Sequence, residues 1–407
     1  MTRSRTEAAR ERRLRRRKKL MAANAVLLAA IATVVVWNIY ASALQRDNAA
    51  SVETVQGTGQ DRPGDAAPDR PGDSADPEHE SDPAPQAPDE PRRVNLAFVG
   101  DILLGEYVGT LLKRNGYHYP YEHVREQLQA ADIAAANLET AVTDIKEKPE
   151  QKTYEFRSEP QALPALKEAG FDLVSLANNH VLDFGTEGLF DTIKHLEEQQ
   201  LLYVGAGIDA DEAYKPVIVE RNGIRVAYVS FSRVVPFVEW KAGRGQAGVA
   251  ETYDHRRPVE TIRAAKQEAD VVVVLVHWGE ERMLTPEPDE QVELGHRFID
   301  AGADLVIGSH PHVLQGFERY KDRWIAYSLG NFIFTKSLDP LTYDSGILEA
   351  SCEKGGECEL QLTPYRVDTP QPRPMEPEER AAVWKRLSEL SVNAIIKEDG
   401  RIAPASD

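Results

Sequence analysis

Polar side chains of metal-binding types follow the predicted strands of this chain, each near the point where a strand ends. Carboxylates, amides and imidazoles dominate these positions, and no cysteine lies among them. Because open α/β sheets bind ligands outside the carboxyl ends of their strands, we expect the side chains to share one site. The strand-end residues are Asp101, Asn137, Glu139, Asn178, Asn179, His180, His277, Glu280, His310, His312 and Asn331.

These residue types suit a centre of divalent metal ions. Neutral imidazoles and carboxylates bind Zn, Mn or Fe. A carboxylate such as Glu139 can bridge two ions, and a turn at Pro311 would let His310 and His312 serve different ions. Two such ions can activate water and clamp an in-line displacement. A histidine that is not a ligand can protonate the leaving group.

Each residue also has a plain structural interpretation when it is considered alone. Asp101 could cap the next helix, Asn178 and Asn179 could be turn residues, and His277 could be a hydrogen-bonded structural histidine. The coincidence of these types at six separate strand ends favours a shared polar site instead.

The elements that must position these side chains alternate between strands and helices. Such alternation predicts α/β layers, and the late strands with few helices between them predict that one sheet is mixed. The folded body is expected at 93–370, followed by a C-terminal helix and tail at 371–407. Strands are predicted at 94–100, 132–136, 171–177, 201–204, 215–220, 224–231, 271–278, 304–308, 324–329, 346–351 and 358–366. Helices are predicted near 121–131, 160–169, 186–199, 257–268, 288–301 and 375–397.

The N-terminal part of the chain predicts a membrane anchor. Residues 1–19 are basic, and residues 20–44 carry no formal charge and are long enough to span a bilayer as one helix. Positive charge stays on the cytoplasmic side, which predicts a single-pass protein with its body outside the cell membrane. Residues 45–92, acidic and with eight prolines, predict a disordered stalk. The alternative is a signal peptide cleaved after Ala41-Ser42-Ala43.

The charge of the chain bears on its possible partners, and its two cysteines bear on a possible disulfide. The first 19 residues have a net charge of +8, so the rest of the chain accounts for −26 against a total of −18. An acidic body repels polyanions, so no nucleic-acid partner is expected. Cys352 and Cys358 flank a glycine pair and could form a local disulfide in an oxidising compartment, and the sequence leaves both outcomes open.

The motifs carry a resemblance to a known family. The chain resembles the CapA family of poly-γ-glutamate capsule synthesis proteins over about 93–370. That family is similar to the calcineurin-like metallophosphatases, which implies a four-layer α/β/β/α sandwich with mixed sheets. The motifs are FVGDILLG (98–105), ANLET (136–140), SLANNHVLDFGTEGL (175–189), VHWGEE (276–281), GADLVIGSHPHVLQG (302–316) and YSLGNFIF (327–334).

The resemblance also implies roles for single residues. It assigns Asp101, Glu139, Asn179, His277, His310 and His312 as metal ligands, with Glu139 bridging and His180 as the catalytic acid. Asn137, Asn178, Glu280 and Asn331 are then substrate-binding or supporting residues. Leu103 departs from the pattern, since metallophosphatases usually carry Asp-x-His there. One ion therefore lacks a ligand, and Asn137 is the candidate to replace it.

Two kinds of function follow from the resemblance. The first is a membrane-anchored component of poly-γ-glutamate or other surface-polymer synthesis or export, with two divalent ions in a hydrolase-type site and membrane-embedded synthase subunits as partners. The alternatives are a metallophosphoesterase or wall-polymer hydrolase unrelated to capsule, acting on a phosphoester or anionic polymer, and a non-catalytic ligand-binding or scaffold module. No G-x-x-x-x-G-K-[ST] loop is present, which excludes an ATP-using ligase of that type.

Overall fold

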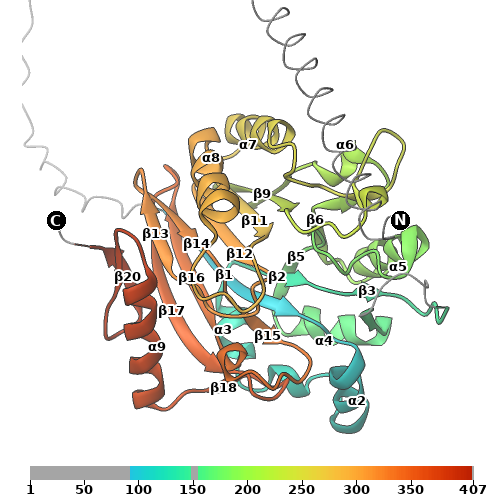
Figure 1. The fold of residues 1–407 in the computed structure, drawn as a ribbon, viewed down its shortest axis with the longest axis horizontal. Helices are drawn as coiled ribbons and strands as arrows, with labels where there is room; N and C mark the ends of the chain where they lie inside the picture. The colour runs from blue at the N-terminus through green and yellow to red at the C-terminus, as the bar shows by residue number, and fades with distance from the viewer. Residues whose placement is uncertain (1–91, 148–154, 406–407) are drawn as a thin grey trace, which may run out of the picture. The chain divides into compact units, whose positions relative to one another are not determined.

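A large mixed sheet forms one half of the body. The computed structural model describes residues 92–147 and 155–405 (Figure 1). In this sheet β1 (Arg93–Ile102) runs parallel to β2 (Ile133–Leu138), and the sheet continues through β5 (Phe171–Ser175) and β6 (Leu202–Val204). On the other side of β1 the strands are antiparallel: β16 (Asp344–Glu353), β17 (Cys358–Arg366), β20 (Arg401–Pro404) and β19 (Ala394–Ile396). Two short strands join this sheet, β15 (Asn331–Ile333) on β1 and β18 (Arg373–Pro374) on β17.

A second sheet of six strands faces the first. Its order is β13-β14-β12-β11-β9-β8, with parallel pairing at its centre and antiparallel strands at both edges. Central β11 reads VVVVLVH and is buried along its whole length, as expected for a parallel strand covered on both faces. The strands are β8 (Val217–Arg221), β9 (Ile224–Ser232), β11 (Val271–His277), β12 (Leu305–Ser309), β13 (Phe317–Tyr320) and β14 (Arg323–Ala326).

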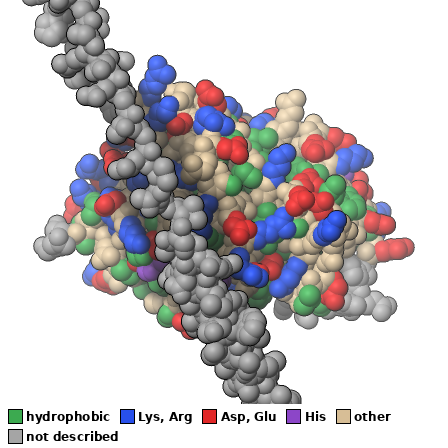
Figure 2. Space-filling view, turned by 90° about the horizontal axis from the view of Figure 1, so that it is seen from above, with side chains coloured by type: hydrophobic (Ala, Val, Ile, Leu, Met, Phe, Trp, Pro, Cys, Tyr) green, Lys and Arg blue, Asp and Glu red, His purple; other side chains and the backbone are tan. Residues whose placement is uncertain are grey.

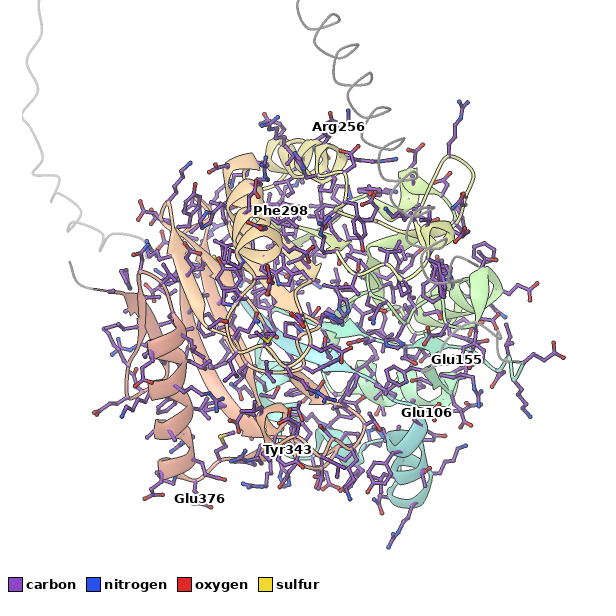
Figure 3. The ribbon with its side chains drawn as sticks, viewed as in Figure 1. Glu106, Glu155, Arg256, Phe298, Tyr343 and Glu376 are labelled. Atoms are coloured by element: carbon purple, nitrogen blue, oxygen red, sulfur yellow. A yellow bond between two sulfur atoms is a disulfide. The ribbon has the colours of Figure 1, made fainter. Side chains whose placement is uncertain are left out.

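Three apolar cores define the order of the layers. Between the sheets, Phe98, Ile133 and Leu173 share one buried cluster with Tyr228 and Val273. The outer face of the large sheet is covered by α2 (Glu106–Asn115), α3 (Arg125–Ala130), α4 (Leu163–Glu168) and α5 (Gly185–Glu198). The outer face of the six-stranded sheet is covered by α6 (Ala210–Ala213), α7 (Arg256–Glu268) and α8 (Glu293–Ala301), whose Phe298 is labelled in Figure 3. The order is helices, sheet, sheet, helices, so mixed sheets and α/β layering are confirmed.

Helices α9 and α2 differ from the sequence expectation, and the short α6 was not predicted either. The predicted helix at 375–397 is α9 (Pro377–Leu390), which ends early because Ser391 is extended and Asn393 has a φ of 53°. The chain then forms β19 and β20, so the described part of the predicted C-terminal helix and tail contributes two strands to the large sheet beside α9 (Figure 1). Helix α2 was not predicted, since Gly105 at its N-cap offers no side chain to mark its start.

The remaining features of the fold are a disulfide, two short two-stranded sheets and a surface of mixed charge. Cys352 and Cys358 form a disulfide across the β16–β17 hairpin, which answers the question the sequence left open. Two-stranded sheets pair β3 (Ala141–Val142) with β4 (Arg157–Ser158), and β7 (Ala206–Gly207) with β10 (Gly248–Val249). On the face shown in Figure 2, acidic and basic side chains are intermixed.

The predicted anchor lies outside the described residues. This holds for the basic segment at 1–19, the apolar span at 20–44 and all of the linker at 45–92 except Arg92. Within 92–147 and 155–405, no helix has the length and apolar character needed to cross a membrane.

Candidate metal centre

The large sheet supplies two buried carboxylates from neighbouring strands. Asp101 near the end of β1 is in register with Asn137 on β2 and with Asn331 on β15. Glu139 follows β2 directly, and both acids are completely buried. Gly100 permits the close approach of the chain on the β15 side, because a Cβ there would lie 1.8 Å from the carbonyl oxygen of Gly330. That oxygen accepts the Asp101 amide at 2.9 Å, which fixes the backbone of the carboxylate.

The six-stranded sheet supplies three imidazoles from the end of β11 and the turn after β12. His277 is the last residue of β11 and is in register with Ser309, the last residue of β12. His310 and His312 follow, with φ values of 95° and 57°. Both residues are in the left-handed region, so the chain turns here instead of continuing as a strand, and both rings lie near the same carboxylate, that of Glu139.

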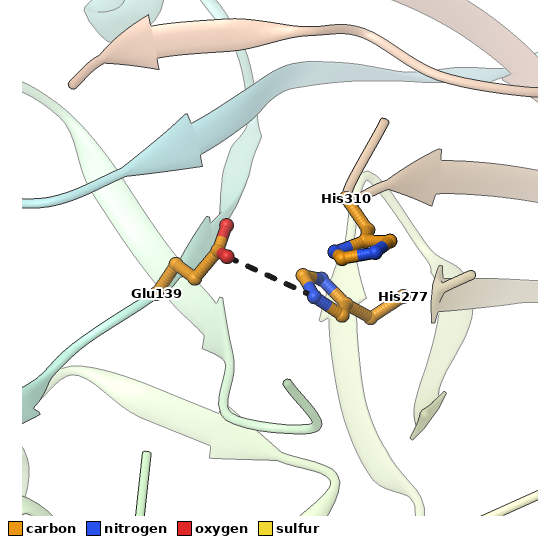
Figure 4. Close-up of side chains that lie close together, drawn as sticks. All are labelled: Glu139, His277 and His310. Carbon is orange, nitrogen blue, oxygen red and sulfur yellow. Dashed lines mark ion pairs between the residues drawn. The ribbon is translucent and has the colours of Figure 1, made fainter. Parts of the chain in front are cut away.

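These five side chains form two overlapping donor groups. One group is Asp101, Glu139 and His312, and the other is Glu139, His277 and His310; in each, the donor atoms lie within 4.8 Å of one another. Glu139 Oε1 is 3.8 Å from Nε2 of His277 (Figure 4) and 3.9 Å from Nε2 of His312. Asp101 Oδ2 is 3.2 Å from Nδ1 of His312. One carboxylate is thus common to both groups, which is the arrangement that two ions with a shared ligand require.

The electrostatics of the two turn histidines differ. Burial, with the neighbouring His312, lowers the pKa of His310 to about 3, so its imidazole stays neutral. Its Nδ1 is buried and has no hydrogen-bond partner among the described residues. For His312, burial lowers the pKa, but the hydrogen bond and charge of Asp101 outweigh burial and raise the pKa overall. A neutral buried imidazole beside two buried carboxylates is a donor set suited to a divalent cation.

Three predicted asparagines support the cluster through hydrogen bonds. Asn137 Nδ2 donates to Asp101 Oδ1 at 2.8 Å, and its Oδ1 accepts from Asn178 Nδ2 at 3.2 Å. Asn178 Oδ1 accepts the backbone amide of His180 at 3.1 Å, which shapes the loop after β5. Asn331 Oδ1 accepts from His312 Nδ1 at 2.9 Å. The amide oxygen of Asn137 is therefore turned toward Asn178, and a supporting role for these residues stays a prediction.

The loop after β5 adds an acid–base pair beside the donor groups. His180 Nδ1 donates to the buried Asp183 Oδ2 at 2.7 Å, and the same oxygen accepts the Phe156 amide at 2.7 Å. The Phe156 ring stacks on His180 with centroids 4.1 Å apart. Asn179 Oδ1 accepts from His277 Nε2 at 2.9 Å, so Asn179 reaches the second donor group.

Several residues of the site were not predicted. Asp183 stands three positions after His180, and His-x-x-Asp spacing could have identified it. Phe334 lies over His312 with centroids 4.8 Å apart, but nothing in its sequence context marks an aromatic neighbour of the site. Glu281 has a carboxylate oxygen within 4.8 Å of donor atoms of His310 and His312. The predicted Glu280 is different: its side chain is exposed, and no hydrogen bond or ion pair within 92–147 and 155–405 joins it to the cluster.

Comparisons with known proteins identify relatives of this chain. The family model described as "Bacterial capsule synthesis protein PGA_cap" matches residues 95–336. The capsule biosynthesis protein CapA of Bacillus anthracis is 34% identical over 72% of this chain and 72% of its own length. The PGA biosynthesis protein CapA of Bacillus subtilis is 32% identical over 76% of this chain and 81% of its own length.

A solved structure shows a weaker likeness. The NAD nucleotidase of Haemophilus influenzae has a TM-score of 0.42 and 12% identity, covering 75% of this chain and 65% of the nucleotidase. The family match, in contrast, covers every predicted metal ligand. The chain therefore belongs to the bacterial capsule synthesis protein PGA_cap family, as its resemblance to the CapA proteins indicates.

Proposed function

We propose that this protein takes part in the synthesis or export of a poly-γ-glutamate capsule or a related surface polymer, through a hydrolase-type site that binds two divalent ions. The observation that carries the proposal is the position of Glu139, whose one carboxylate belongs to both donor groups. The polymer class follows from the family and from the printed names of its relatives, which are capsule and PGA biosynthesis proteins.

The residues divide between the two ions according to their contacts. Asp101, Glu139 and His312 would hold the first ion; Glu139, Asn179, His277 and His310 would hold the second. Bound divalent ions would lower the pKa of water and offset the negative charge of an in-line displacement. Mn, Zn and Fe all accept such oxygen and nitrogen ligands, so the donor set selects the class of ion and not its identity.

The protein itself would supply proton transfer. His180 is oriented by the buried Asp183, which fixes a proton on Nδ1, so proton exchange with a substrate would take place at Nε2. A histidine held in this way can protonate the leaving oxygen or nitrogen of a phosphoester or of an amide in a polymer. Stacking on Phe156 fixes the plane of the ring.

A non-catalytic role in the same assembly is the second candidate. Its basis is Leu103, which is fully buried and cannot bind metal, so the first ion has only three of the donors named above. A site incomplete in this way could bind an anionic group of the polymer without cleaving it. Membrane-embedded synthase subunits would then be the partners of the protein.

The predicted anchor would determine where in the cell the protein acts. Residues 20–44 would hold the protein in the cell membrane with the metal centre outside, where a surface polymer is made or exported. Protease treatment of intact cells tests this placement. The body should be digested while residues 1–19 stay protected, and a body protected in intact cells would contradict it.

One experiment separates the enzyme from the scaffold. Full-length protein in detergent is analysed for metal content and assayed on bis(p-nitrophenyl) phosphate and on γ-glutamyl oligomers. The enzyme predicts turnover that His180→Ala removes and that His195→Ala, a change at a histidine bonded to Glu198 on α5, leaves intact. Two ions with no turnover, and co-purification with membrane synthase subunits, support the scaffold. Absence of metal under every loading condition would contradict both.

A further inference from the structure

We infer that Glu281 is an additional protein ligand of the metal centre and completes the ion held by Asp101, Glu139 and His312. The inference rests on the proposed two-ion site. Its first support is distance: a carboxylate oxygen of Glu281 lies within 4.8 Å of donor atoms of both His310 and His312. Glu281 itself is exposed, so it reaches these histidines from the solvent side of the site.

The loop that carries Glu281 is fastened to the site on both sides of that residue. Before it, the Trp278 amide donates to the Ser309 carbonyl at 3.2 Å, and the fully buried Trp278 indole donates to the Tyr327 carbonyl at 2.9 Å. After it, the Arg282 amide donates to the carbonyl of Pro311, between the two histidines, at 2.8 Å. These bonds hold the backbone of Glu281 over the His310–His312 turn.

Two residues of this loop, Gly279 and Arg282, have left-handed backbone conformations. Gly279 has a φ of 84°, where a side chain would also meet the Gln291 carboxamide at 2.5 Å. Arg282 has a φ of 65°, which a residue with a side chain adopts rarely. The strain at Arg282 persists because the surrounding structure over-determines the backbone there, including the bond from the Arg282 amide to the Pro311 carbonyl.

The first ion needs a further donor, and the other candidate cannot supply it. Leu103 offers no ligand atom, and the amide oxygen of Asn137 accepts a hydrogen bond from Asn178. Asn137 presents its Nδ2 to Asp101 instead, and an amide N–H is no metal ligand. Asp101 and Glu139 bring two negative charges against two divalent cations, so a third carboxylate also improves the charge balance of the centre.

Metal affinity measured on full-length protein tests the inference. Titration calorimetry with Mn²⁺, together with elemental analysis after dialysis, gives the affinity and number of ions for wild type, Glu281→Gln, Glu281→Asp and Glu280→Gln. Glu280→Gln is the matched control. It removes the same charge from the neighbouring residue, whose side chain lies outside the cluster. Circular dichroism confirms that each variant is folded.

The expected results differ for ligand and bystander. A ligand role predicts that Glu281→Gln weakens one of the two ions by about 10- to 100-fold, and that Glu281→Asp, which keeps the charge but shortens the reach, also weakens it. Glu280→Gln should stay within about twofold of wild type. Two ions in Glu281→Gln with unchanged affinity would overturn this inference and leave the proposed function standing, whereas wild type without any bound ion would overturn the proposed function.

Discussion

Replacing Asp183 with asparagine tests how His180, the proposed catalytic histidine, is held. Asp183 is buried, and its Oδ2 accepts two hydrogen bonds of 2.7 Å, from His180 Nδ1 and from the Phe156 amide. Asparagine has nearly the same shape but no charge. Its carboxamide can present an oxygen to both donors, but the charge-assisted character of both bonds is lost.

The size of the effect follows from the number of bonds. Hydrogen bonds to charged groups stabilise a protein by about 1.5–3 kcal/mol, and those between neutral groups by about 0.5–1.5 kcal/mol. The two bonds to Asp183 therefore predict a loss of about 2–3 kcal/mol in the free energy of unfolding. If the bond to His180 is also needed to orient the imidazole in the transition state, losing about 1–1.5 kcal/mol there lowers kcat by about 5- to 12-fold.

Three measurements check this prediction on full-length protein. Urea unfolding gives the stability, phosphodiester turnover gives kcat, and nitrogen NMR of the His180 ring gives its tautomer without requiring turnover. Wild type should show the proton on Nδ1, as a carboxylate partner requires. Asp191→Asn is the control, because it removes a carboxylate on the helix that follows, α5, which accepts a hydrogen bond from Thr143 and not from His180.

Some outcomes would refute the reasoning. An Asp183→Asn variant with unchanged kcat and an unchanged Nδ1–H tautomer would show that Asp183 does not orient His180. Loss of bound metal in this variant would also contradict the account, because Asp183 belongs to neither of the two donor groups assigned to the ions.

Two further predictions concern stability. Gly100→Ala places a Cβ 1.8 Å from the carbonyl oxygen of Gly330 and should lower the free energy of unfolding by about 1–3 kcal/mol or more in urea titrations. Gly355→Ala is the control, because its Cβ meets nothing within 4 Å and should leave the stability unchanged. Equal stabilities of the two variants would contradict the close approach at Gly100. Glu379 has its pKa lowered to about 2, first by the hydrogen bond from Arg373, so its contribution is full above pH 4.5 and is lost as the pH falls toward 2. Acid titrations should show this loss in wild type and in Glu378→Gln and a smaller loss in Glu379→Gln; a parallel loss in all three would refute it.

The sequence predicted much of the fold because its strands are strongly patterned. The run VVVVLVH and the alternation of strands and helices indicated a buried sheet with covering helices, and β17 has the predicted bounds at 358–366. The short strand β15 and the glycine-capped helix α2 were not predicted. Both are stabilised by tertiary contacts, such as the pairing of β15 with β1, that no local pattern reports.

The site was predictable to a similar degree. Strand ends of parallel sheets meet at one edge, so residues such as Asp101 and His277 could be assigned to one site from the sequence. The choice between Glu280 and Glu281 depends on the left-handed turn at Gly279, which no pattern of residue types specifies. The orientation of the Asn137 amide depends on Asn178, 41 residues away, and the sequence could not show that its oxygen is engaged.

The metal content of the purified protein tests the central claim most directly. Full-length wild type and Glu139→Gln are loaded with Mn²⁺ or Zn²⁺, dialysed, and analysed for metal per chain. Because Glu139 belongs to both donor groups, we predict two ions per chain in wild type and fewer than one in the variant. Wild type with no bound ion, or a Glu139→Gln variant that still binds two, would contradict the account.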